Sequence, residues 1–285
     1  MLYIILSIIC SVTVGVIFKM SRRHDVCTTQ IVAWNYVIAI ALTYMVFTPD
    51  ITIANEDTPW EIYIPLMLLL PSVFMFLAAS IKHMGIVKTD VAQRLSLFIP
   101  ILAAWFIFKE DFNAYKVIGL AIGFPAIVLI LLRKDQSEGR KWIFLAVVLL
   151  GFGIIDVLFK QIVLHTNLPY TTSLFIVFCG ALVVSWAVVL YEIIAKHNRL
   201  QLINFGFGSM VGIFNFCNIL FYLLAHKAFA DNPSTVFAAM NMGVIVLGSL
   251  VGIIAFKERV AKLNYLGLIM ALVAIVFITL SQVYK

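Results

Sequence analysis

The chain has 285 residues, of which 63% are hydrophobic and only 12% are charged, with a formal net charge of +6. Soluble domains average about 45–50% apolar and about 25% charged residues, so the composition argues strongly against a soluble fold. The few positive charges lie between long apolar runs, which argues against nucleic acid as a partner and indicates groups that flank a membrane.

Ten segments carry few or no charges, and we predict that each crosses a bilayer as a helix. A crossing takes about 20 apolar residues, so ten use about 200 and leave no room for an appended soluble domain. The runs are too long and too uniformly apolar for the alternating strands of a membrane barrel. In chain order they are residues 2–18, 28–47, 62–81, 90–108, 114–132, 142–159, 171–191, 205–225, 233–256 and 263–283.

Two of these helices begin with recognisable start signals. Asp90 and Gln93 have the spacing of a capping box, which predicts that the fourth helix starts at Asp90. Asn232 followed by Pro233 predicts the start of the ninth helix, because proline at the first helical position removes only an N–H that has no partner in the helix.

The two halves of the chain repeat each other. The Phe-Lys-Glu triplet at residues 108–110 recurs at 256–258, 148 residues later, and the same offset carries Gly119 onto Gly267. The Phe-Lys pair at 18–19 recurs at 159–160. We therefore predict a duplication, with residues 1–132 and 142–285 as five-helix repeats and residues 133–141 as a polar linker.

Five helices per repeat place the second copy in the membrane upside down relative to the first. The positive charges follow this inversion. Six lysines or arginines lie in the loops after the first and third helices, against two after the second and fourth; the corresponding loops of the second half hold two and five. When the four lysines and arginines of the linker are added to one face and Lys285 to the other, 15 lie on the linker-bearing face and five on the face of the termini. By the positive-inside rule this places the linker in the cytoplasm.

This architecture, with Glu110 and Glu258 just after the fourth helix of each half, resembles the EamA group of the drug/metabolite transporter superfamily. The resemblance covers essentially the whole chain and also includes the Asn232-Pro233-Ser234 start of the ninth helix. It implies a ten-helix secondary transporter or exporter with a central cavity between the halves, and it implies cytoplasmic termini. Because the charge count places the termini outside, the orientation stays open. We assign both glutamates to structure at the helix ends.

Ionisable residues inside the predicted spans are costly, at about 2.5–3.5 kcal/mol on insertion scales, so each needs a reason. Asp156 lies four residues before Lys160, and Asp90 lies four residues before Arg94, so each pair shares a helical face and can form an ion pair. The alternative is that Asp156 and Arg94 face a cavity and bind substrate.

Four asparagines at membrane depth offer amide groups that need partners. Asn35, Asn215, Asn218 and Asn241 either hydrogen-bond between helices or contact substrate in a cavity. The candidates for cavity residues are therefore Asn35, Arg94, Asp156, Asn215, Asn218 and Asn241.

Three pairs of glycines at four-residue spacing predict close approach of helices. We expect them to pack inside the bundle, with a homodimer face as the alternative. They are Gly119 with Gly123, Gly208 with Gly212, and Gly248 with Gly252.

No catalytic, nucleotide-binding or metal-binding motif is present, so we predict neither an enzyme nor a cofactor. The predicted function is ion- or proton-coupled transport of a small organic metabolite by alternating access. The predicted location is the plasma (inner) membrane, as a multi-pass protein whose partners are the lipid bilayer and a small-molecule substrate. The alternative is a non-transporting membrane scaffold or a lipid-flippase partner subunit. Amino acids, nucleosides and cationic drugs fit the polar residues about equally.

Overall fold

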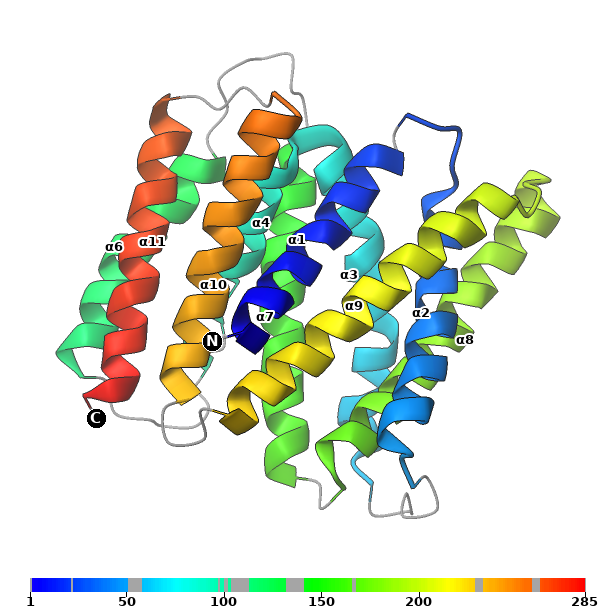
Figure 1. Ribbon diagram of the computed structural model, residues 1–285, viewed down its shortest axis with the longest axis horizontal. Coiled ribbons are helices and arrows are strands. Elements are labelled where there is room, and N and C mark those ends of the chain that lie inside the picture. The colour runs from blue at the N-terminus through cyan, green and yellow to red at the C-terminus, as the bar shows by residue number, and fades with distance from the viewer. Residues whose placement is uncertain are drawn as a thin grey trace.

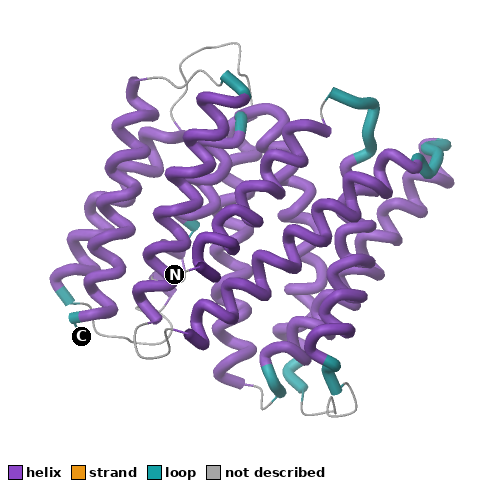
Figure 2. Tube along the Cα trace, in the orientation of Figure 1, coloured by secondary structure: helices purple, strands orange, loops and turns teal. Residues whose placement is uncertain are grey.

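The computed structural model describes residues 2–21, 23–50, 58–96, 98–99, 102–103, 113–131, 141–165, 168–228, 233–257 and 262–284. Within these ranges the chain forms ten α-helices and one π-helical turn, without a β-strand (Figure 2). The predicted all-helical class is therefore confirmed.

Each predicted segment overlaps one α-helix, but α4 is only ten residues long, and residues 97, 100–101 and 104–108 of the fourth segment lie outside the described part of the chain. The helices of the first half are α1 (Leu2–Ser21), α2 (Thr28–Phe47), α3 (Trp60–Met84), α4 (Ile86–Leu95) and α6 (Ala114–Leu131). Those of the second half are α7 (Trp142–His165), α8 (Tyr170–Lys196), α9 (Leu202–Ala228), α10 (Pro233–Leu250), which continues as the π-helical turn η3 (Val251–Ala255), and α11 (Lys262–Val283). The bounds of α2 agree with the prediction, and α10 starts at Pro233 as expected.

Among the described residues, six helices are long and apolar enough to cross a membrane: α1, α2, α3, α7, α8 and α9. Shorter apolar helical stretches lie in α6, in α10 with η3, and in α11, at Ala114–Ala126, Gly243–Ala255 and Tyr265–Ser281. Large apolar side chains such as Val183, Ile194 and Ile254 are exposed on the outer surface. An apolar outer surface of this kind suits contact with lipid.

The predicted start of the fourth helix at Asp90 is wrong. α4 begins at Ile86, directly after Gly85, whose φ of 90° separates α4 from α3. Glycine adopts this conformation readily because it has no Cβ. Asp90 instead lies within α4 and is buried, so its carboxylate cannot serve as the cap of this helix.

The helices form one elongated bundle (Figure 1). α6 and α11 pack together at one edge, α2 and α8 pack together at the other, and α1, α3, α4, α7, α9 and α10 lie between them. Both termini lie toward the same end of the bundle, which we call the terminus-bearing end. The last turn of α6 and the first turn of α7 lie at the opposite, linker-bearing end.

Glycines allow several of these helices to approach closely. A Cβ at Gly208 would lie 2.8 Å from the carbonyl oxygen of Ile31, and one at Gly212 would lie 2.9 Å from that of Asn35, so both glycines of α9 face the backbone of α2. The other predicted glycines lie in comparable places: Gly123 faces the ring of Phe98, Gly248 faces the carboxylate of Asp90, and Gly119 and Gly252 are buried.

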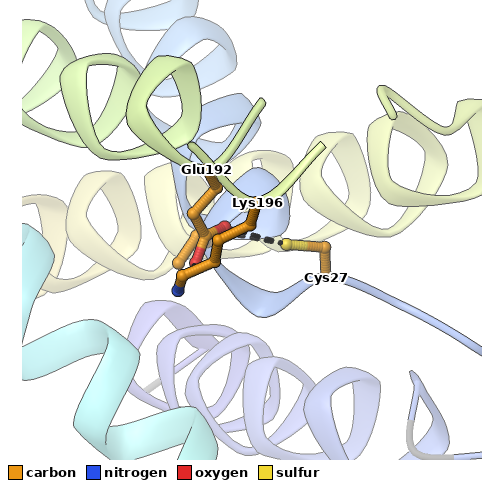
Figure 3. A network of polar contacts seen from close by, with 4 residues as sticks. Cys27, Glu192 and Lys196 are labelled. Carbon is orange, nitrogen blue, oxygen red and sulfur yellow. Dashed lines mark hydrogen bonds and ion pairs between the residues drawn. The ribbon is translucent and has the colours of Figure 1, made fainter. Parts of the chain in front are cut away.

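A polar junction joins α2, α8 and α9 at the linker-bearing end. The carboxylate of Glu192 accepts hydrogen bonds from Thr29 Oγ1 at 2.5 Å and from Cys27 Sγ at 3.3 Å, and its other oxygen lies 3.4 Å from Lys196 Nζ (Figure 3). These contacts tie the end of α8 to the start of α2, where Cys27 stands at the cap position without a side-chain capping bond of its own.

The second part of the junction is a pair of buried amides. Asn204 Nδ2 donates to Gln30 Oε1 at 2.8 Å, Gln30 Nε2 donates to the carbonyl oxygen of Arg199 at 3.0 Å, and the backbone N–H of Cys27 donates to Asn204 Oδ1 at 3.1 Å. Asn204 thereby links the start of α9 to the start of α2.

We expect Asn204→Ala to lower the free energy of unfolding by about 1–3 kcal/mol, because it leaves the buried Gln30 Oε1 and the N–H of Cys27 without this partner. Thermal unfolding in detergent measures the change. Asn198→Ala is the control, because the side chain of Asn198 is exposed on the same connection. Equal melting temperatures for the two variants would contradict a stabilising role of the junction.

Candidate functional site

A cavity of about 460 Å³ lies in the middle of the bundle, between α4, α7, α9 and α10. Ligand pockets in proteins commonly measure about 300–1,000 Å³, so the cavity has the size of a small-molecule site. Its lining residues are Gln93, Arg94, Ser96, Phe152, Asp156, Tyr170, Asn218, Ile219, Tyr222, Leu223, Met240 and Asn241.

The structure places four of the six sequence candidates on this cavity: Arg94, Asp156, Asn218 and Asn241. The other two, Asn35 and Asn215, are not among its lining residues. Asn215 Nδ2 donates to Asn35 Oδ1 at 3.2 Å, and Asn35 is fully buried, so this pair joins α9 to α2. The hydrogen bond between helices is thus the role that the geometry favours for these two amides.

Asp156 lies in the second half of α7 and is exposed, although it is far from either end of its helix. Its carboxylate is therefore open to the cavity that it lines. The predicted ion pair with Lys160 falls on a side chain outside the part of the chain that the structure describes.

Arg94 brings a positive charge to the same cavity from α4. Its Nη2 donates to Ser11 Oγ of α1 at 3.0 Å, while its buried Nε has no hydrogen-bond partner among the residues that the structure describes. The guanidinium lies within electrostatic range of Asp90, Asp156 and Tyr222. Opposite charges from α4 and α7 thus meet at one cavity.

Asp90, the predicted partner of Arg94, has a place in helix packing as well. It is 7% exposed, and its carboxylate lies against Gly248 of α10, where any side chain would overlap it. The small residue at position 248 therefore lets α4 and α10 pack closely beside the cavity.

Asn218 of α9 is hydrogen-bonded to Ser7 of α1. Ser7 Oγ lies 2.8 Å from Asn218 Oδ1 and 3.1 Å from the carbonyl oxygen of Asn218. Ser7 is fully buried, so this contact fixes one side of the Asn218 amide against α1, while the residue also lines the cavity.

Sequence reasoning missed the two tyrosines of the cavity, Tyr170 and Tyr222, together with Gln93 and Ser96. Tyr222 lies four residues after Asn218, so the two share a face of α9, and this spacing was a usable signal. Tyr170 is the first residue of α8, at the terminus-bearing end, and no pattern in the sequence connects it with α4 or α9.

The cavity combines a carboxylate, a guanidinium, three amides, two phenols and a wall of Phe152, Ile219, Leu223 and Met240. Such a lining binds a small polar organic molecule with an apolar part. Among the residues that the structure describes, no group of three or more histidines, cysteines or carboxylates could hold a metal ion.

Asn215→Ala serves as a test of which amides belong to the site. We expect it to lower the stability by about 0.6 kcal/mol, the average for a hydrogen bond between membrane helices, and to leave ligand binding in the cavity unchanged. Thermal unfolding with and without a ligand of the folded protein measures the two effects. A loss of ligand binding without a loss of stability would return Asn215 to the site.

The long apolar helices of the described part of the chain define a multi-pass membrane protein. Residues 1–132 match the EamA-like transporter family, and the chain belongs to this family. A protein of Haemophilus influenzae described as uncharacterized is 39% identical over 284 residues, which are 95% of each chain. A crystal structure with 14% identity has the same fold, with a TM-score of 0.60 over 100% of this chain and 98% of the other.

Proposed function

We propose that the protein is a secondary carrier or exporter that moves a small organic metabolite by alternating access. The observation that carries the proposal is the central cavity, with the exposed carboxylate of Asp156 inside a bundle of apolar helices. Membership of a transporter family supports it. The protein would act without catalysis, as a multi-pass protein of the plasma (inner) membrane whose partners are the bilayer and its substrate.

The pattern of helix contacts supports two inverted repeats, 1–132 and 142–285. If each helix of the first half is exchanged with its counterpart in the second, the contact of α1 with α10 becomes that of α7 with α4, and the contact of α2 with α9 becomes that of α8 with α3. The contacts α6–α11, α2–α8 and α4–α10 map onto themselves. A two-fold axis that passes between α4 and α10 accounts for these contacts.

The position of the cavity suits one state of a carrier. Its lining residues lie on α4 and α10 and include Tyr170, the first residue of α8, and α8 begins at the terminus-bearing end. In an inverted-repeat carrier the two halves exchange conformations, which would open the equivalent path toward the linker-bearing end.

An ion gradient would drive the transport, since the sequence contains no nucleotide-binding motif. Asp156 is the residue we propose for the coupling. A carboxylate at membrane depth can bind either a proton or a cationic group of the substrate, and each neutralises its negative charge. Arg94 from the facing helix would balance that charge when the site is empty.

Transport by the purified protein alone tests the proposal. Wild-type protein is first screened by thermal shift with L-serine, uridine and choline, which represent amino acids, nucleosides and organic cations; a ligand of the folded state raises the melting temperature. Counterflow of the stabilising compound into proteoliposomes is the expected result. The alternative, a scaffold or flippase partner subunit, predicts no flux without a second protein.

The orientation calls for a separate experiment. The charge count places the linker in the cytoplasm and the termini outside, and the family resemblance implies the reverse. We expect a reporter that is active only in the cytoplasm to be silent at the C-terminus and active when inserted in residues 133–141. The opposite pattern would show that the charge rule fails for these short loops.

A further inference from the structure

Two amides of the cavity occupy the same position in the two repeats. The offset of 148 residues that carries the Phe-Lys-Glu triplet onto its copy also carries Gln93 onto Asn241. Gln93 lies on α4 and Asn241 on α10, and both line the cavity. No other pair of cavity residues is related by this offset.

The packing of α4 against α10 places these two amides near the centre of the molecule. The two helices run in opposite directions and are in contact, with Asp90 beside Gly248. Gln93 lies three residues after Asp90 on α4. Because the helices are antiparallel, it is level with the residue three before Gly248 on α10, which is position 245, four residues from Asn241. At 1.5 Å per helical residue, the two amides are about 6 Å apart along the bundle.

A separation of this size lets one substrate group lie between the two amides. Each carboxamide offers a carbonyl oxygen as acceptor and an NH₂ group as donor, so the pair suits a neutral polar group that both donates and accepts, such as a hydroxyl or an amide. The charged groups of the substrate would lie nearer to Asp156 and Arg94, which have no equivalents at the same offset.

We infer that Gln93 and Asn241 form a symmetry-related pair of substrate-binding amides, one from each repeat, that holds the same substrate group in both facing states. The inference rests on the proposed function. When the repeats exchange conformations, equivalent positions on the axis exchange surroundings, so both amides stay in the cavity. Tyr170, the first residue of α8, lines the cavity in the state seen here, and we expect it to leave the lining in the other state.

Accessibility of single cysteines tests the position of the pair without knowledge of the substrate. In a chain whose four native cysteines are replaced by serine, Gln93→Cys, Asn241→Cys, Asp156→Cys and Tyr170→Cys are exposed to a membrane-impermeant sulfonated maleimide in cells and in inverted vesicles. We expect both members of the pair to react from both sides, and Tyr170→Cys to react about tenfold faster from the terminus-bearing side. Gel filtration confirms that each variant is folded.

The outcomes separate the inference from the proposed function. If Asp156→Cys reacts from both sides but one member of the pair reacts from a single side, the symmetric pair is wrong and alternating access stands. If all four cysteines react from one side only, alternating access fails and the inference fails with it.

A second arm tests binding, with whichever of L-serine, uridine or choline the wild-type protein carries. We expect Gln93→Leu and Asn241→Leu each to lower counterflow about tenfold, the loss that a missing hydrogen-bond partner causes. The exchanged variant Gln93→Asn with Asn241→Gln keeps both amides and retains most of the counterflow. Loss in the exchanged variant equal to that in the leucine variants would overturn the pairing, and normal counterflow in the leucine variants would overturn the binding role.

Discussion

Asp156→Asn is expected to lower transport by about 10- to 100-fold while leaving the melting temperature unchanged. A hydrogen bond to a charged group contributes about 1.5–3 kcal/mol, and each 1.4 kcal/mol corresponds to a factor of ten. Asp156 is exposed in the cavity, so its replacement by an amide of the same shape disturbs no packing contact. Counterflow in proteoliposomes and thermal unfolding measure the two quantities.

Asp156→Glu is the matched control, because it keeps the charge and moves it by one methylene group. We expect it to retain part of the transport. Arg94 offers a second control: in Arg94→Gln with Asp156→Asn, the loss should be smaller than the sum of the single losses, because each single variant already removes the attraction between these two charges. Unchanged counterflow in Asp156→Asn would remove this residue from the site.

Gly208→Ala and Gly212→Ala are expected to destabilise the protein by about 1–3 kcal/mol each, the usual cost of overpacking. The new methyl groups would lie 2.8 Å and 2.9 Å from carbonyl oxygens of α2, and backbone cannot move aside as a flexible side chain can. This cost exceeds the gain of about 1 kcal/mol that alanine brings over glycine within a helix. Thermal unfolding in detergent measures the difference.

Gly206→Ala is the control for this series. Gly206 lies on the same helix, two residues before Gly208, and nothing is within 4 Å of a Cβ there. We expect this variant to be as stable as the wild type or more stable, since only the helix-forming tendency changes. A loss equal to that of Gly208→Ala would show that helix contact is not what the glycine at 208 provides.

The helices were predictable because their signal is local. Long apolar runs appear in the sequence whatever the packing, and the bounds of α2 and the start of α10 at Pro233 followed from the runs and from proline chemistry. The start of the fourth helix was not predictable from the spacing of Asp90 and Gln93. The boundary between α3 and α4 lies earlier, at Gly85, and the carboxylate of Asp90 is buried against α10.

The kinds of polar group in the site were predictable from the sequence, but which of the candidate residues line the cavity was less so. Asp156, Arg94, Asn218 and Asn241 are conspicuous as polar groups at membrane depth, and all four line the cavity. Asn35 and Asn215 are equally conspicuous, yet they bond to each other between α2 and α9. An amide in an apolar helix needs a partner, but the sequence does not say whether that partner is another helix or a ligand.

By itself the sequence determined the helical class, the repeat of the Phe-Lys-Glu triplet and the set of polar residues inside the spans, because each depends on composition and spacing along one chain. Only the tertiary structure decided which face of each helix meets the cavity. The rotation of a helix about its own axis depends on contacts with its neighbours, such as Gly208 and Gly212 against α2. That rotation brings Tyr170 to the cavity and keeps Asn215 from it.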